Sequence, residues 1–171
     1  RINAGLGYEY ARYYNSTYNN VTIQGQPVVI DYESNLYLSK FALFSQVSKD
    51  YFNEKLLTSF GIRTDFSNYS KSLSNPLEQL SPSLSLSYRL SEAWSVNANI
   101  SRYHQLPSYT ILGYRDGDNN LVNLNNDVKY IRADHMVFGL EYLTDWKSRF
   151  TLESFLKHYT RYPYSIKDSI M

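Results

Sequence analysis

The chain has 171 residues, of which 43% are hydrophobic and 19% are charged, and its formal net charge at pH 7 is +1. This balance excludes an intrinsically disordered chain and the strongly basic surface of a nucleic-acid-binding domain. The absence of cysteine excludes a disulfide framework, thiolate metal sites and a cysteine nucleophile. Aromatic residues are frequent, with 18 Tyr, 8 Phe and 2 Trp, and this bias favours strands. No apolar run reaches the roughly 18 to 20 residues of a transmembrane helix.

The N-terminal part of the chain predicts three strands. In residues 2–14, apolar or aromatic side chains alternate with polar or small ones, which indicates a strand with two unlike faces. A polar loop is predicted over residues 15–34. The second strand is predicted over residues 35–47, but its alternation is poor and its two faces cannot be assigned from the pattern. Residues 56–66 alternate clearly and predict the third strand.

Residues 80–109, "LSPSLSLSYRLSEAWSVNANISRYHQLPSY", predict a two-faced hairpin. Leucines and Tyr88 alternate with serines before the turn, and Trp94, Val96, Ala98 and Ile100 alternate with serines and asparagines after it. Such a hairpin fits a soluble β-sandwich with a buried core. It also fits a membrane barrel with lipid outside and water inside. Parity leaves both open.

The connections alternate between long and short. The longest spans residues 105–130, and two more strands are predicted over residues 135–142 and 150–162. This rhythm is typical of an up-and-down outer-membrane barrel, with long loops outside the cell and short turns in the periplasm. Both tryptophans lie at short turns and many tyrosines lie toward the long loops, as two aromatic girdles require. Single-chain bacterial barrels have an even number of strands from about 8 upward, so further strands are expected from a longer parent chain.

Three stretches carry a resemblance to a known family: residues 80–114, residues 130–142 ("YIRADHMVFGLEY") and residues 149–166 ("RFTLESFLKHYTRYPYSI"). They resemble the barrel of Bacteroidetes-type TonB-dependent outer-membrane receptors. The resemblance implies an all-β, antiparallel up-and-down transmembrane barrel in the bacterial outer membrane. The seven predicted strands would form part of a larger barrel of 22 strands.

The resemblance also implies a function. Such receptors import a scarce nutrient using the proton-motive force, with a plug inside the barrel and a periplasmic segment that TonB pulls. Residues 1–171 would then be a partial barrel domain, with the plug absent from this chain. The implied partners are outer-membrane lipid, the remaining barrel and plug of the parent chain, the TonB complex through the parent and, as one option, a surface lipoprotein. No nucleic acid, cofactor or enzymatic activity is expected. The alternative function is a soluble β-sandwich carbohydrate-binding module.

Candidate ligand-binding residues lie where the fifth strand ends and in the loop after it, because loops carry function more often than strands do. They are Tyr103, His104, Tyr109, Tyr114 and Arg115. No catalytic set is recognised.

Asp116, Asp118 and Asn120 have the one-three-five spacing of a calcium loop. Leu121 stands where that motif needs glycine and Asp127 where it needs glutamate. The three residues therefore stay weak metal candidates, and no metal is expected.

Overall fold

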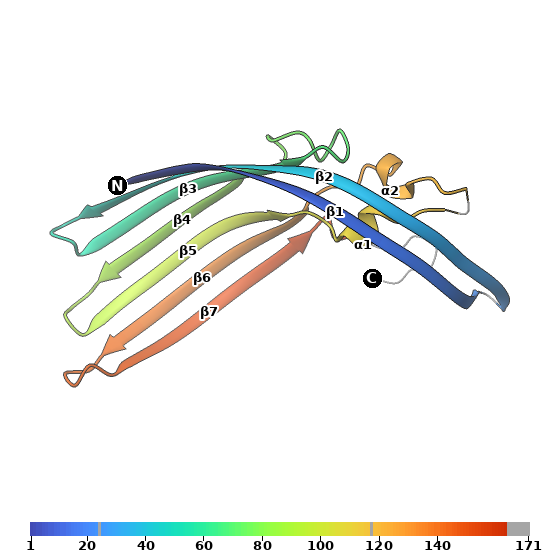
Figure 1. Cartoon of the computed structure of the whole chain (residues 1–171). Coiled ribbons are helices and arrows are strands. Elements are labelled where there is room, and N and C mark those ends of the chain that lie inside the picture. The colour runs from blue at the N-terminus through green and yellow to red at the C-terminus, as the bar shows by residue number, and fades with distance from the viewer. Residues whose placement is uncertain (24, 117, 164–171) are drawn as a thin grey trace.

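The structure is a computed structural model and describes residues 1–23, 25–116 and 118–163. Its strands are β1 (Ile2–Ile23), β2 (Gln26–Tyr51), β3 (Leu56–Ser67), β4 (Ser81–Arg89), β5 (Trp94–Gln105), β6 (Ile131–Leu143) and β7 (Arg149–Thr160). Two short helices, α1 (Tyr109–Leu112) and α2 (Val122–Asn125), lie in the connection between β5 and β6. All seven strands form one antiparallel sheet in chain order, which curves like a piece of a wall (Figure 1).

The single sheet decides between the two architectures that the sequence allowed. A sandwich needs two sheets packed face to face, and every strand of the described residues belongs to the same sheet. The expectation of seven antiparallel strands is therefore confirmed, and the soluble sandwich is wrong. No helix within the described ranges is long and apolar enough to cross a membrane.

The strand register places an unbroken apolar row across the sheet. Successive partners in this row are Ile2, Val47, Phe60, Leu84, Ile100, Met136 and Leu156. Each of these side chains is between 43% and 73% exposed. A row of large exposed apolar side chains on one face of a sheet requires an apolar solvent, as lipid provides around a barrel. We call this face the outward face.

The next row along each strand is polar or small. It runs through Asn3, Gln46, Gly61, Ser83, Ser101, His135 and Lys157. Because neighbouring residues of a strand point to opposite faces, this row lies on the other side of the wall, which we call the inward face. Its side chains bond to one another, as where the amide of Asn99 donates to Ser85 Oγ at 2.7 Å. The inward face therefore suits a water-filled or plugged lumen.

The register also assigns the faces of β2. Leu43 and Val47 lie outward, as partners of Leu6 and Ile2, while Phe44 lies inward opposite Gly5. A Cβ atom at Gly5 would come within 2.6 Å of the Phe44 ring. Gly5 thus makes room for an aromatic ring on the polar face, and this ring, with Leu36 and Leu38 of the same face, blurs the alternation of β2.

Aromatic side chains of the outward face gather at two heights. At the short-turn end, the rings of Trp94 and Tyr142 lie 4.6 Å apart. At the loop end, Phe41 lies 5.1 Å from Tyr8 and 5.3 Å from Phe66 between ring centroids. Phe41 comes ten residues before the end of β2, which matches the roughly 9 to 11 residues of a tilted transmembrane strand. The two clusters correspond to the two girdles of an outer-membrane barrel.

The polar loop predicted over residues 15–34 is wrong. β1 and β2 stay paired as far as Ile23 and Gln26, with Gly25 at a φ of +80° in the turn between them. This part of the hairpin lies beyond the outer aromatic cluster, and most of its side chains are exposed, so neither face needs an apolar band. Alternation therefore gives no signal there, and β-branched residues such as Val21 and Thr22 still favour a strand.

The buried apolar residues lie beneath the two long loops. Leu36 and Leu38 of β2, Tyr69 and Leu73 of the β3–β4 connection, and Leu112 and Tyr130 of the β5–β6 connection form one cluster, which we call the loop core. Within it, the Tyr69 hydroxyl donates to the Leu112 carbonyl at 2.6 Å. Both loops are thereby held against the inward side of the wall, above the apolar band.

The two faces of the wall should respond differently to a charge. Ala98 lies outward between Leu86 and Phe138, and its neighbour Asn97 lies inward. We expect Ala98→Arg to destabilise the intact receptor in phospholipid vesicles by about 2–4 kcal/mol, the cost of arginine on the lipid face near the bilayer midplane. Asn97→Arg, the matched control, should cost less than about 1 kcal/mol. Urea titration of the folded fraction checks this, and equal losses would contradict the assignment of faces.

The loop core should open as a unit when it is truncated. Leu112→Ala removes a fully buried side chain, at a cost of about 2–5 kcal/mol. Tyr69→Phe leaves a buried carbonyl without its donor, at a cost of about 1–3 kcal/mol. Hydrogen exchange of the intact receptor should then speed up in both long loops together, while β4 and β5 keep their protection. Leu84→Ala on the outward face is the control and should leave the loops unchanged.

Candidate functional site

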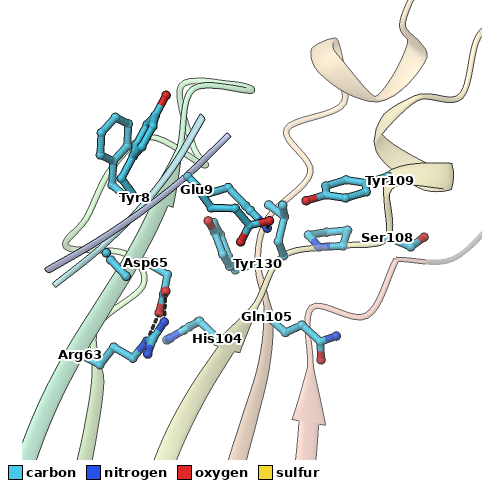
Figure 2. Close-up of a pocket in the computed structure, with 15 residues that line it drawn as sticks. Tyr8, Glu9, Arg63, Asp65, His104, Gln105, Ser108, Tyr109 and Tyr130 are labelled. Carbon is cyan, nitrogen blue, oxygen red and sulfur yellow. Dashed lines mark hydrogen bonds and ion pairs between the residues drawn. The ribbon is translucent and has the colours of Figure 1, made fainter. Parts of the chain in front are cut away.

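A cavity of about 740 Å³ lies on the inward face, next to the loop core (Figure 2). Its walls come from β1, β2 and β3, from the end of β5 with the segment that follows it, and from Tyr130 before β6. Strands far apart in the sequence thus meet the folded loop at the loop end of the wall. The volume lies within the range of roughly 300–1,000 Å³ that is usual for ligand pockets.

Two ion pairs line the strand side of the cavity. Glu9 and Lys40 are register partners on β1 and β2, and Lys40 Nζ lies 2.6 Å from Glu9 Oε1. Arg63 and Asp65 stand two residues apart on the inward face of β3, and the guanidinium makes two bonds of 2.6 Å to the carboxylate. The four formal charges cancel, so this wall is polar without a net charge.

Tyrosines line the loop side of the cavity. Tyr109, the first residue of α1, has its ring centroid 5.5 Å from Lys40 Nζ and 5.8 Å from the Tyr13 ring. Tyr130 is 3% exposed, and burial raises the pKa of its phenol to about 12. Its hydroxyl therefore stays neutral at physiological pH. The loop side offers an aromatic face in reach of a cation.

His104 occupies the end of β5, at the margin of the cavity, although as the register partner of Arg132 it has the parity of the outward face. Its Nδ1 lies 3.0 Å from the Ser81 hydroxyl, and that hydroxyl donates to the Gln79 carbonyl. With the serine proton used in this way, Nδ1 of the imidazole is the donor to Ser81. A neutral His104 then keeps Nε2 as an acceptor.

Two of the five ligand candidates from the sequence, His104 and Tyr109, line this cavity. The other three do not. Tyr103 faces inward farther along the wall, with its ring 5.0 Å from that of His135. Tyr114 packs edge-on against Tyr32 at 5.6 Å, and Arg115 donates to the Asn119 carbonyl at 2.6 Å. The loop therefore splits the predicted set.

Asp116 organises the loop that the sequence offered as a weak metal candidate. Its carboxylate accepts the backbone N–H of Asn120 at 2.8 Å and that of Asp118 at 3.1 Å. The bond from Asn120 is the largest of the effects that hold the pKa of Asp116 below its usual value. Gly117 lies outside the described residues. Among the residues that the structure describes, no three His, Asp or Glu side chains are grouped to hold a metal ion.

The cavity residues that the sequence-based set missed include the two ion pairs and the buried tyrosine, namely Glu9, Lys40, Arg63, Asp65 and Tyr130. Parity already placed Arg63 and Asp65 together on the polar face of their strand. The contact between Glu9 and Lys40 depends on the pairing of β1 with β2, and the poor alternation of β2 concealed it. Tyr130 carried no signal, because its burial arises when the loop folds back.

Comparison with known proteins agrees with this geometry. The family model described as TonB dependent receptor-like, beta-barrel, matches residues 1–170. No curated protein matches the chain. The match covers nearly the whole chain and includes the β1–β2 hairpin, which the resemblance noted in the sequence did not reach. The chain therefore belongs to the TonB-dependent receptor-like β-barrel family, a family of the outer membrane of Gram-negative bacteria.

Proposed function

We propose that this chain forms part of the wall of a Bacteroidetes-type receptor that imports a scarce nutrient with energy from the proton-motive force. In this proposal residues 1–171 are part of a larger barrel of 22 strands, whose plug lies outside this chain. The neighbouring strands of that barrel pair with the free edges of β1 and β7, the plug packs against the inward face, and TonB acts through the parent protein. The family consists of transporters, which is consistent with the expectation that the chain is not an enzyme.

The position of the cavity is the observation that supports a binding role. It opens on the inward face at the loop end of the wall, where a ligand from outside the cell first meets the lumen. It is formed jointly by wall strands and a folded loop, so its shape depends on a rigid scaffold and a variable segment. Such an arrangement is common in binding sites.

The lining favours a polar ligand of low net charge. The cations of Lys40 and Arg63 are already neutralised by Glu9 and Asp65, so a strongly charged ligand would have to displace one of these pairs. The Tyr109 ring and the His104 imidazole offer an aromatic face and a hydrogen-bonding edge. We infer that the ligand stacks on Tyr109 and bonds to the paired charges.

Tyr109 and Tyr103 form a matched pair for testing the cavity. Both were ligand candidates and both are tyrosines, but Tyr109 lines the cavity and Tyr103 does not. We expect Tyr109→Ala in the intact receptor to raise the ligand Kd about tenfold or more, as loss of a central aromatic contact does. Tyr103→Ala should change the Kd by less than about threefold. Titration calorimetry checks this, and equal effects would remove the cavity from the ligand surface. Tyr109→Phe keeps the ring and should retain most of the affinity.

Binding and uptake should separate when the energy source is removed. A protonophore added to cells that carry the intact receptor should abolish accumulation of radiolabelled ligand. Binding to the cell surface should persist, because the wall and its cavity need no energy to hold a ligand. Deletion of TonB should have the same effect. Uptake that continues in both cases would indicate a passive pore and contradict the proposed import mechanism.

A further inference from the structure

Two arginines interrupt the apolar outward face at its loop end. Arg102 of β5 and Arg132 of β6 share the outward parity of Ile100 and Met136. Asp134 lies between them: Arg102 Nε is 2.7 Å from one of its carboxylate oxygens, and Arg132 Nε is 3.0 Å from the other. Two cations therefore share one anion, and the cluster keeps one positive charge. The wall carries this charge on the side that faces lipid.

The height of the cluster places it at the membrane surface. Asp134 comes nine residues before the end of β6, and Phe41 of the outer aromatic cluster comes ten residues before the end of β2. The row immediately below the cluster is Ile100, Met136 and Leu156, all large, apolar and at least half exposed. At the height where β1, β2 and β3 carry the aromatic residues around Phe41, β5 and β6 therefore carry cations. Aromatic girdles mark the level of lipid headgroups.

Both guanidinium groups keep donors that Asp134 does not use. A guanidinium has five N–H donors, and each arginine spends two of its nitrogens on this carboxylate. Within the described chain neither arginine has another hydrogen-bond acceptor. Their side chains are 38% and 29% exposed, so the unused donors reach the surface. His158, the exposed partner of Asp134 on β7, adds a neighbouring polar edge.

We propose that Arg102 and Arg132 bind the phosphate group of an outer-leaflet lipid on the outward face of the wall. A phosphate at the height of the headgroups offers oxygens that the two planar guanidinium groups can bind in pairs of hydrogen bonds. It also neutralises the one positive charge that Asp134 leaves on the cluster. Asp134 neutralises one of the two arginines, so the pair presents one net positive charge to the phosphate. The site lies beside His104, the register partner of Arg132, but its two arginines do not line the inward cavity, and it does not depend on the proposed nutrient uptake.

The test uses the intact receptor, purified in dodecyl maltoside and stripped of lipid. Native mass spectrometry measures its binding of bisphosphorylated lipid A and of the same glycolipid without phosphates. We expect the wild type to prefer the phosphorylated form about tenfold, as charge-assisted bonds to two arginines allow. Arg102→Gln with Arg132→Gln should abolish this preference. Lys157→Gln, which removes a cation from the inward face of β7, should retain it.

An opposite change separates the site from a folding defect. Asp134→Asn frees both guanidinium groups and should increase the preference for phosphate. If the double variant Arg102→Gln with Arg132→Gln fails to fold, Asp134→Asn provides the test. An unchanged or lowered preference of Asp134→Asn for phosphorylated lipid A would overturn the proposal. Equal losses in the glutamine pair and in Lys157→Gln would also overturn it. Inorganic phosphate at millimolar concentration should not displace the lipid, and displacement would show a site for the free anion instead.

Discussion

The structure depends on one constraint, which is that backbone N–H and C=O groups inside a bilayer must bond to each other because no water is present there. Seven strands satisfy it by pairing in chain order, each with its neighbours in the sequence. Pairing fixes the register, and a slip of one residue would turn every side chain of a strand to the other face. The unbroken row from Ile2 to Leu156 is the visible consequence.

Register also divides the polar chemistry of the wall into two environments. Arg63 with Asp65, and Arg102 with Asp134, are similar pairs of residues near the loop end. The first pair occupies positions of β3 whose side chains point inward, into a cavity beside the loop core. The second pair occupies positions of β5 and β6 whose side chains point outward, at the level of the aromatic girdle. Similar ion pairs therefore meet a hydrated lumen in one case and lipid headgroups in the other.

The success of the sequence-based predictions follows the solvent around each segment. Where lipid lies on one side and water on the other, as from Ser81 to Gln105, the alternation is clean and both strands were predicted. Beyond the membrane most side chains of the outer part of the β1–β2 hairpin are exposed, so the pattern of residues 15–34 resembled a loop. In β2, the packing of Phe44 over Gly5 placed an aromatic ring on the polar face and hid the inside from the outside.

The amino-acid sequence by itself determined the all-β class and the number of strands. These properties are local, because they depend on side-chain parity and on turn residues a few positions apart. Tertiary structure decided which side chains meet. Glu9 reaches Lys40, Tyr109 enters the cavity while Tyr103 does not, and Arg102 and Arg132 converge on Asp134. Such contacts depend on the register between strands and on how a long loop folds back. The periodicity of a single segment predicts neither the register nor the path of the loop.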